Sequence, residues 1–241
     1  MPEPAVVRIV RVLGRGMPMV SSMNQDRTAA RQLYKLLLKR FGRQDWWPAE
    51  SHFEMMAGAI LVQHTAWRNV DTSLRGLKAA GLLSQGALAQ VSEEELACIV
   101  RPSGFMKSKS RALKGLASWL VNRGYTEPDM MPSRDPDLRE ELLALPGIGN
   151  ETADVIRLYA FGQKCFIWDA YALRMLRALG LASWRNYDQA LRHQGEFIDL
   201  DDFTLTEMKE YHGLIVTAGK EAGQSGDWDF LTTQTSEASV R

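Results

Sequence analysis

The fold is decided by the stretch Leu142-Leu-Ala-Leu-Pro-Gly-Ile-Gly-Asn-Glu-Thr-Ala-Asp-Val-Ile156, in which two helical patterns flank a tight turn at residues 145–149. Gly147 and Gly149 allow the backbone to turn sharply and to come close to a ligand. The helix that follows opens with free N–H groups and the positive end of its dipole. The stretch therefore predicts a helical hairpin that binds phosphate, and a plain helix–helix turn is the alternative that the turn alone leaves open.

A second informative stretch follows about twenty residues later. Phe166-Ile-Trp-Asp169 leads into residues 170–180, whose pattern predicts a helix that ends at a glycine. Asp169 stands at the expected N-cap position, and capping is the ordinary structural role of an aspartate there. Taken alone, this residue would be interpreted as a cap.

The remaining chain is helical in pattern. Apolar residues recur at helical spacing from residues 26–41 up to 204–218, and the spacers contain Gly, Pro, Ser and Asp. Strands are nearly absent, so we expect an all-α fold of two helical lobes, a central one of about 50–155 and a second one formed by 26–49 and 156–222. Residues 1–25 are expected to be a flexible extension, and residues 223–241 a flexible tail.

The composition limits the function classes. The 241 residues include 29 Lys+Arg and 29 Asp+Glu, so a general polyanion binder is not expected and any nucleic-acid surface must be local. The only two cysteines, Cys98 and Cys165, cannot supply four thiolates, which excludes zinc fingers and iron–sulfur clusters. Without a long apolar run or a secretory signal, the chain is expected to be soluble and cytoplasmic.

The hairpin and the aspartate together resemble the endonuclease III-like superfamily of helix-hairpin-helix DNA glycosylases. The resemblance implies a DNA cleft between the two lobes and a catalytic role for Asp169, which would face the sugar of a flipped-out nucleotide. A carboxylate there stabilises the oxocarbenium-like sugar that forms as the base departs, and it can orient the attacking water.

Two departures from the family pattern point to one branch. Members that also cut the strand carry a lysine where this chain has Glu151, and a carboxylate cannot form the Schiff base. Members with an iron–sulfur cluster carry four cysteines after the last helix, and Gly223 stands where the first would be. With these departures, four stretches make residues 30–222 similar to the 3-methyladenine DNA glycosylase III branch: Trp46-Trp-Pro48, Gly58-Ala-Ile-Leu-Val-Gln-His-Thr65 with Trp67, Val100-Arg-Pro-Ser-Gly-Phe105, and Tyr211-His-Gly213 before Lys220.

That resemblance implies a monofunctional glycosylase of base excision repair that removes alkylated purines, chiefly 3-methyladenine, without lyase activity or cofactor. The flipped base would lie in a pocket formed by Trp46, Trp47, Pro48, Trp67 and Lys220. A methylated adenine is cationic, and an indole face attracts a cation by about 0.5–2 kcal/mol. The alternative is that the tryptophans are ordinary core and the lysine a solvated helix end. A cationic base leaves without a general acid, and the sequence places no second carboxylate or histidine for that task.

Contacts with DNA are expected from a local basic patch and from the turn regions. The patch holds Arg101, Lys107, Lys109, Arg111 and Lys114 without an acidic residue, a pattern that suits phosphate contacts but also a solvated helix face. By the resemblance, Gln63 would fill the gap left by the extruded nucleotide and Phe105 would wedge into the opposite strand, although a core role for Phe105 is equally open. The hairpin residues Gly147, Gly149 and Asn150 would hold phosphate, and the carbonyls of Leu145 and Ile148 could bind a sodium or potassium ion.

Two other functions remain open. The first is a bifunctional endonuclease III-like glycosylase and lyase for oxidised pyrimidines, against which Glu151 and the missing cysteines argue. The second is a non-catalytic DNA-binding helix-hairpin-helix protein, in which Asp169 would only cap a helix. In each case we expect a monomer that binds double-stranded DNA and no membrane, near the nucleoid of a bacterium or archaeon.

Overall fold

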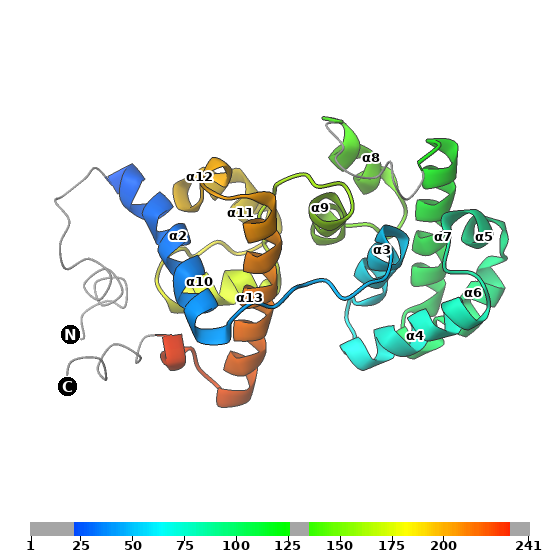
Figure 1. The fold of residues 1–241 in the computed structure, drawn as a ribbon, viewed down its shortest axis with the longest axis horizontal. Helices are drawn as coiled ribbons and strands as arrows, with labels where there is room; N and C mark the ends of the chain where they lie inside the picture. Colours follow the sequence, from blue (N-terminus) through cyan, green and yellow to red (C-terminus); the bar gives the residue numbers. More distant parts are fainter. Residues whose placement is uncertain (1–21, 126–134, 232–241) are drawn as a thin grey trace. The chain divides into compact units, whose positions relative to one another are not determined.

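The computed structural model describes residues 22–125 and 135–231, and every regular element within them is a helix (Figure 1). This confirms the predicted all-α fold. No helix in these two stretches is both long and apolar enough to span a bilayer. The chain divides into two compact units: a central unit, Trp47–Cys165, and a terminal unit formed by Met1–Trp46 and Phe166–Arg241.

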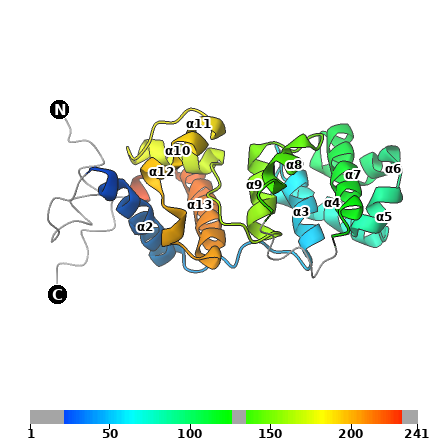
Figure 2. The same ribbon diagram turned by 90° about the horizontal axis from the view of Figure 1, so that it is seen from above.

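The central unit is organised around its longest helix, α7. Its elements are α3 (His52–Leu61), α4 (Trp67–Ala79), α5 (Gln85–Gln90), α6 (Glu93–Ile99), the 3-10 turn η1 (Arg101–Ser103), α7 (Met106–Asn122), α8 (Leu138–Ala144) and α9 (Asn150–Tyr159). Helices α3, α5 and α6 pack against α7, whose leucines 113, 116 and 120 are fully buried. Helices α8 and α9 form the hairpin, and α3 packs on α9 (Figure 2).

The terminal unit is organised around α13. Its elements are α2 (Ser22–Phe41), α10 (Ala170–Ala178), α11 (Tyr187–Arg192), α12 (Gln194–Phe197), the 3-10 turns η3 (Leu200–Asp202) and η4 (Asp229–Leu231), and α13 (Leu205–Ser225). Helix α13 packs against both α2 and α10. The buried Tyr211 hydroxyl donates to the Ala30 carbonyl at 3.0 Å, which joins α13 to α2, and burial raises the pKa of Tyr211.

The start of α13 is fixed by a capping box. The Thr204 hydroxyl accepts the Glu207 N–H, and the Glu207 carboxylate accepts the Thr204 N–H in return. Arg31 of α2 also pairs with Glu207, at 2.5 Å. One carboxylate thus both begins α13 and ties it to α2.

The structure differs from the predicted bounds at several places. Helix α2 begins at Ser22, inside the stretch 1–25 expected to be a flexible extension. Residues 47–49, expected in the second lobe, belong to the central unit. Residues 156–165 belong to the central unit. The tail predicted to be flexible from residue 223 is folded up to residue 231, because α13 continues to Ser225, the Phe230 ring lies 6.3 Å from that of Phe41, and Leu231 is buried. This stretch is mostly polar, so its few apolar residues do not form a pattern that predicts a folded segment. The predictions for residues 1–21 and 232–241 fall outside the described residues.

Candidate functional site

The hairpin turn joins α8 to α9 with a backbone that only glycine suits. Gly147 has φ +79°, and a Cβ there would lie 3.0 Å from the Cβ of Ala112 on α7. The Ile148 N–H donates to the Leu145 carbonyl at 3.3 Å. Gly149 is the N-cap of α9 and offers no side-chain acceptor to the first amides of the helix. A helix start of this kind suits an anion such as a DNA phosphate.

A buried ion-pair network holds the two helices of the hairpin together. The Asp154 carboxylate, 1% exposed, accepts from Arg139 Nε at 2.9 Å and from Arg157 Nη1 at 2.6 Å. Arg139 also donates to the side-chain oxygen of Asn150 at 2.7 Å. Two guanidinium groups therefore compensate one buried carboxylate, and the side-chain oxygen of Asn150 is directed towards α8.

Asp169 does cap a helix, and its carboxylate has a second neighbour. Its Oδ1 accepts the Ala172 N–H at 2.7 Å at the start of α10, and its Oδ2 lies 3.7 Å from Nε2 of His212 on α13. Both side chains are 7% exposed. The sequence alone did not indicate that a histidine lies beside this carboxylate. The packing of α10 on α13 brings the two residues together, which no local pattern could indicate.

Two of the predicted pocket residues meet in the terminal unit. Lys220 is exposed, and its Nζ lies 5.4 Å from the centre of the Trp46 ring. Trp46 packs so closely on α13 that a Cβ at Gly213 would lie 2.7 Å from the Trp46 Cβ. The buried Glu210 accepts the backbone N–H groups of Gln44 and Asp45, which fastens the segment before Trp46 to α13. This cation and this indole therefore share one surface.

Two other predicted pocket residues meet in the central unit. The ring of Trp47 lies edge-on to the rings of Trp67 and Tyr159, with centroids 5.4 Å and 5.8 Å away. All three belong to the central unit, and so does the exposed Pro48. Sequence reasoning missed Tyr159, because its position on the apolar side of α9 carries no distinguishing signal.

Gln63, the predicted gap-filling residue, lies close to the hairpin. Its Nε2 is 3.5 Å from Oε1 of Glu151 in the first turn of α9. Glu151 is the position where the resemblance places a lysine in strand-cutting members. The structure thus brings Gln63 next to the residue on which the expectation of missing lyase activity rests.

Phe105 is not a core residue. Its side chain is 68% exposed, and its backbone adopts the left-handed conformation with φ +46°. The Phe105 ring lies 5.9 Å from that of His64, which is also exposed and left-handed at φ +57°. His64 lies within the stretch 58–65, but no feature of the sequence marked it as a candidate site residue.

The basic patch is divided by burial. Arg101, Lys107 and Arg111 are exposed, as a phosphate-binding role requires. Lys109 is only 5% exposed, and its ammonium donates to the carbonyls of Leu61, Gln63 and Ser103 at 2.8, 2.8 and 2.6 Å. The prediction that Lys109 contacts DNA is therefore wrong: three backbone carbonyls saturate its donors. Lys114 likewise donates to the Val91 carbonyl.

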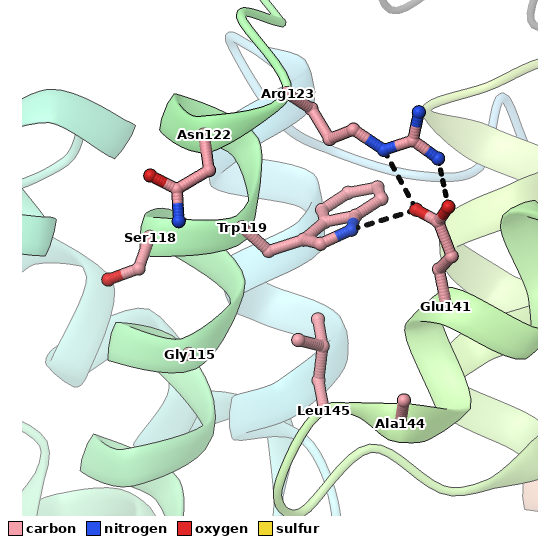
Figure 3. Close-up of a pocket in the computed structure, with 8 residues that line it drawn as sticks. All are labelled: Gly115, Ser118, Trp119, Asn122, Arg123, Glu141, Ala144 and Leu145. Carbon is pink, nitrogen blue, oxygen red and sulfur yellow. Dashed lines mark hydrogen bonds and ion pairs between the residues drawn. The ribbon is translucent and has the colours of Figure 1, made fainter.

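A pocket of about 480 Å³ opens on another part of the central unit (Figure 3). It is lined by Gly115, Ser118, Trp119, Asn122, Arg123, Glu141, Ala144 and Leu145. Glu141 accepts from the Trp119 indole at 3.0 Å and pairs with Arg123, so the charges within the pocket are matched. Of the predicted site residues it contains only Leu145, and its matched charges give it no particular attraction for a cationic base.

Comparison with known proteins agrees with this geometry. The family model described as HhH-GPD superfamily base excision DNA repair protein matches residues 57–199. A protein of Methanocaldococcus jannaschii, provisionally named a DNA repair glycosylase, is 40% identical over 190 residues, 77% of this chain and 84% of that protein. The crystal structure of H. pylori 3-methyladenine DNA glycosylase bound to 1,N6-ethenoadenine is similar with a TM-score of 0.64 and 27% identity, over 84% of this chain and 98% of that chain. A trapped endonuclease III–DNA covalent intermediate, 21% identical, has the same fold, with a TM-score of 0.62 over 80% of this chain and 85% of that chain.

The family match includes the hairpin, Gln63, Phe105 and Asp169. It covers more than half of the sequence, and the archaeal relative covers more than three quarters of it. The chain therefore belongs to the HhH-GPD superfamily of base excision DNA repair proteins.

Proposed function

We propose that this chain is a monofunctional DNA glycosylase that hydrolyses the N-glycosidic bond of alkylated purines, chiefly 3-methyladenine, in double-stranded DNA. The observation that carries the proposal is the Asp169 carboxylate, which is held by the cap of α10 through one oxygen while the other oxygen takes no part in the cap. An anion fixed in this way is suited to stabilise positive charge that develops on a sugar.

The proposed reaction needs little machinery. A purine methylated at N3 already carries positive charge, so it departs without protonation, and the charge moves to the sugar as the bond breaks. Asp169 stabilises that charge and orients a water molecule, which attacks the anomeric carbon and loses a proton. Glu151 cannot form an imine, so water is the nucleophile and the strand stays intact.

Recognition of the base would depend on aromatic and charged side chains. Trp46, Trp47 and Trp67 offer indole faces or edges, and a cationic base gains about 0.5–2 kcal/mol from such a face relative to a neutral one. Similarity to the H. pylori enzyme, whose structure contains 1,N6-ethenoadenine, supports a modified purine as the substrate. Lys220 lies over Trp46, and we propose that this cation and this indole contribute to recognition together.

The DNA would be held and distorted by the central unit. The exposed Arg101, Lys107 and Arg111 contact phosphates, and the amides at the hairpin hold one more. Gln63 and Phe105 enter the duplex when the damaged nucleotide leaves it, which offsets part of the few kcal/mol that flipping costs. The carbonyls of Leu145 and Ile148 remain a predicted site for a monovalent cation. We further propose that catalysis requires no iron–sulfur cluster, since the sequence has two cysteines in all.

The test is base release from three substrates: DNA treated with a methylating agent, undamaged DNA, and DNA with oxidised pyrimidines. Chromatography should show free 3-methyladenine from the first and no base from the other two. Borohydride added during the reaction should trap no protein–DNA adduct. Release of oxidised pyrimidines together with a trapped adduct would instead support the bifunctional alternative, and release of no base from any substrate would support a binding protein.

A further inference from the structure

Two loops of the central unit contain strained residues side by side. The loop after α3 includes His64 with φ +57°, and the loop before α7 includes Phe105 with φ +46°. A residue other than glycine is strained in the left-handed conformation and keeps it only where the surroundings enforce it. The rings of the two residues lie 5.9 Å apart. We call Gln63, His64 and Phe105 the insertion edge.

One buried ammonium group joins these loops. Lys109 Nζ donates to the carbonyl of Leu61, the last residue of α3, to that of Gln63 in the loop after it, and to that of Ser103 at the end of η1. The three N–H donors of a lysine are thus matched by three acceptors. Carbonyls at a helix end carry partial negative charge and lack helical partners, so a cation is favourable there.

Burial of the charged ammonium group of Lys109 costs free energy, which argues that this group has a function. Lys109 is 5% exposed, and burial lowers the pKa of its ammonium group. The Ser103 hydroxyl is fastened in turn to Ser73 at 2.8 Å and to the Asn69 carbonyl at 3.3 Å, both on α4. Lys109 therefore connects the insertion edge to α3, α4 and α7.

We propose that Lys109 is a positioning residue that holds the insertion edge in the conformation in which it enters the duplex. The proposal rests on the entry of Gln63 and Phe105 proposed above, but not on which base is released. If the insertion edge is already ordered, it loses little conformational entropy when it fills the gap. More of the free energy of its contacts with DNA is then left to offset the cost of flipping the nucleotide. Lys109 acts through these residues and touches no DNA itself.

The experiment measures gap filling without base excision. The probe is a duplex with a tetrahydrofuran abasic analogue next to 2-aminopurine, whose fluorescence reports a residue that inserts beside it. Lys109→Met should weaken binding by about tenfold and abolish most of the fluorescence change, because the edge must be ordered on binding. The matched control is Lys114→Met, which removes an ammonium group from the same helix that also donates to a carbonyl. The affinity of Lys114→Met for the duplex should be within about twofold of that of the unaltered protein.

A double-mutant cycle separates positioning from general loosening. In a Gln63→Ala/Phe105→Ala background, Lys109→Met should weaken binding by less than about twofold, because the side chains through which it acts are already absent. Should Lys109→Met fail to fold, Lys109→Arg enters the same cycle, since it retains the charge but not the compact three-donor head group. Folding of each variant is checked by circular dichroism.

The outcomes distinguish this proposal from the proposed function. A protein that releases no methylated purine but still fills the gap, in a manner that depends on Lys109, refutes the proposed substrate and supports the positioning role. A folded Lys109→Met variant that fills the gap like the unaltered protein overturns the positioning role. The positioning role is also overturned if Lys109→Met lowers the affinity by the same factor with and without the side chains of the insertion edge.

Discussion

The imidazole Nε2 of His212 lies 3.7 Å from Oδ2 of Asp169, and both side chains are buried. The other oxygen of Asp169 accepts the Ala172 N–H and thereby caps α10. The distance to His212 is too long for a direct hydrogen bond, so the imidazole borders the carboxylate rather than binding it. His212 therefore places a polar group beside the oxygen of Asp169 that takes no part in the cap.

This neighbour should influence the rate of base release. His212→Leu removes the polar group beside Asp169 and should lower the single-turnover rate about tenfold, because a small displacement of a catalytic group is costly. His212→Gln keeps a polar side chain and should recover part of the rate. Affinity for an abasic-analogue duplex should be unchanged in both variants. Equal rates for His212→Leu and the unaltered protein would show that the contact is only packing.

Close packing of Trp46 on α13 makes Gly213 intolerant of a side chain. Gly213→Ala would place a Cβ 2.7 Å from the Trp46 Cβ, and such overpacking typically costs about 1–3 kcal/mol. Gly223→Ala on the same helix meets no atom within 4 Å and should stabilise by about 0.5–1 kcal/mol through helix propensity. Thermal unfolding of both variants checks the contrast. Shifts of the same sign would contradict the packing described.

The capping box of α13 should make stability depend on acid pH. Burial alone would raise the pKa of Glu207, but hydrogen bonds from Thr204 and the charge of Arg31 outweigh it and hold the pKa below its ordinary value. The carboxylate thus contributes stability above the unfolded-state pKa of about 4.3, and that contribution is lost as pH falls through the lower folded-state pKa. The Tm difference between the unaltered protein and Glu207→Gln should therefore shrink below about pH 4. A difference that stays constant down to pH 3 would refute this.

Phosphate contacts from the exposed part of the basic patch should appear in the salt dependence of DNA binding. Lys107→Ala should reduce the slope of log Kd against log salt by about 0.9, since one released counterion is lost. Lys114→Ala, whose ammonium group is engaged with the Val91 carbonyl, should leave the slope unchanged. The two slopes are compared by titrating an undamaged duplex at several salt concentrations. Identical effects of the two changes would mean that the hydrogen bond from Lys114 to Val91 does not keep this lysine from the phosphates.

Much of the fold could be predicted because long amphipathic helices carry a periodic signal. Apolar residues at helical spacing predict helices over residues 53–62, 93–100, 137–144 and 151–161, and these ranges begin and end within two residues of α3, α6, α8 and α9. Helices α5, α11 and α12 escaped prediction because six residues or fewer do not complete a recognisable period. The burial of Lys109 could not be predicted either. The carbonyls that accept its hydrogen bonds belong to two other elements, so they leave no pattern in the sequence around Lys109.

The candidate site could be predicted in part. The hairpin glycines and Asp169 have local signatures, a tight turn and an N-cap, that sequence alone displays. The neighbours His212 and Tyr159 come from distant positions, and only tertiary packing pairs them with Asp169 and Trp47.

The most direct measurement is the release of 3-methyladenine from methylated duplex DNA by Asp169→Asn. Asparagine caps a helix about as well as aspartate, so the variant should fold and unfold like the unaltered protein. It lacks the anion, and the single-turnover rate should fall by about 10²–10³. If the folded variant releases the base at the original rate, Asp169 is a cap only and the proposed mechanism is wrong.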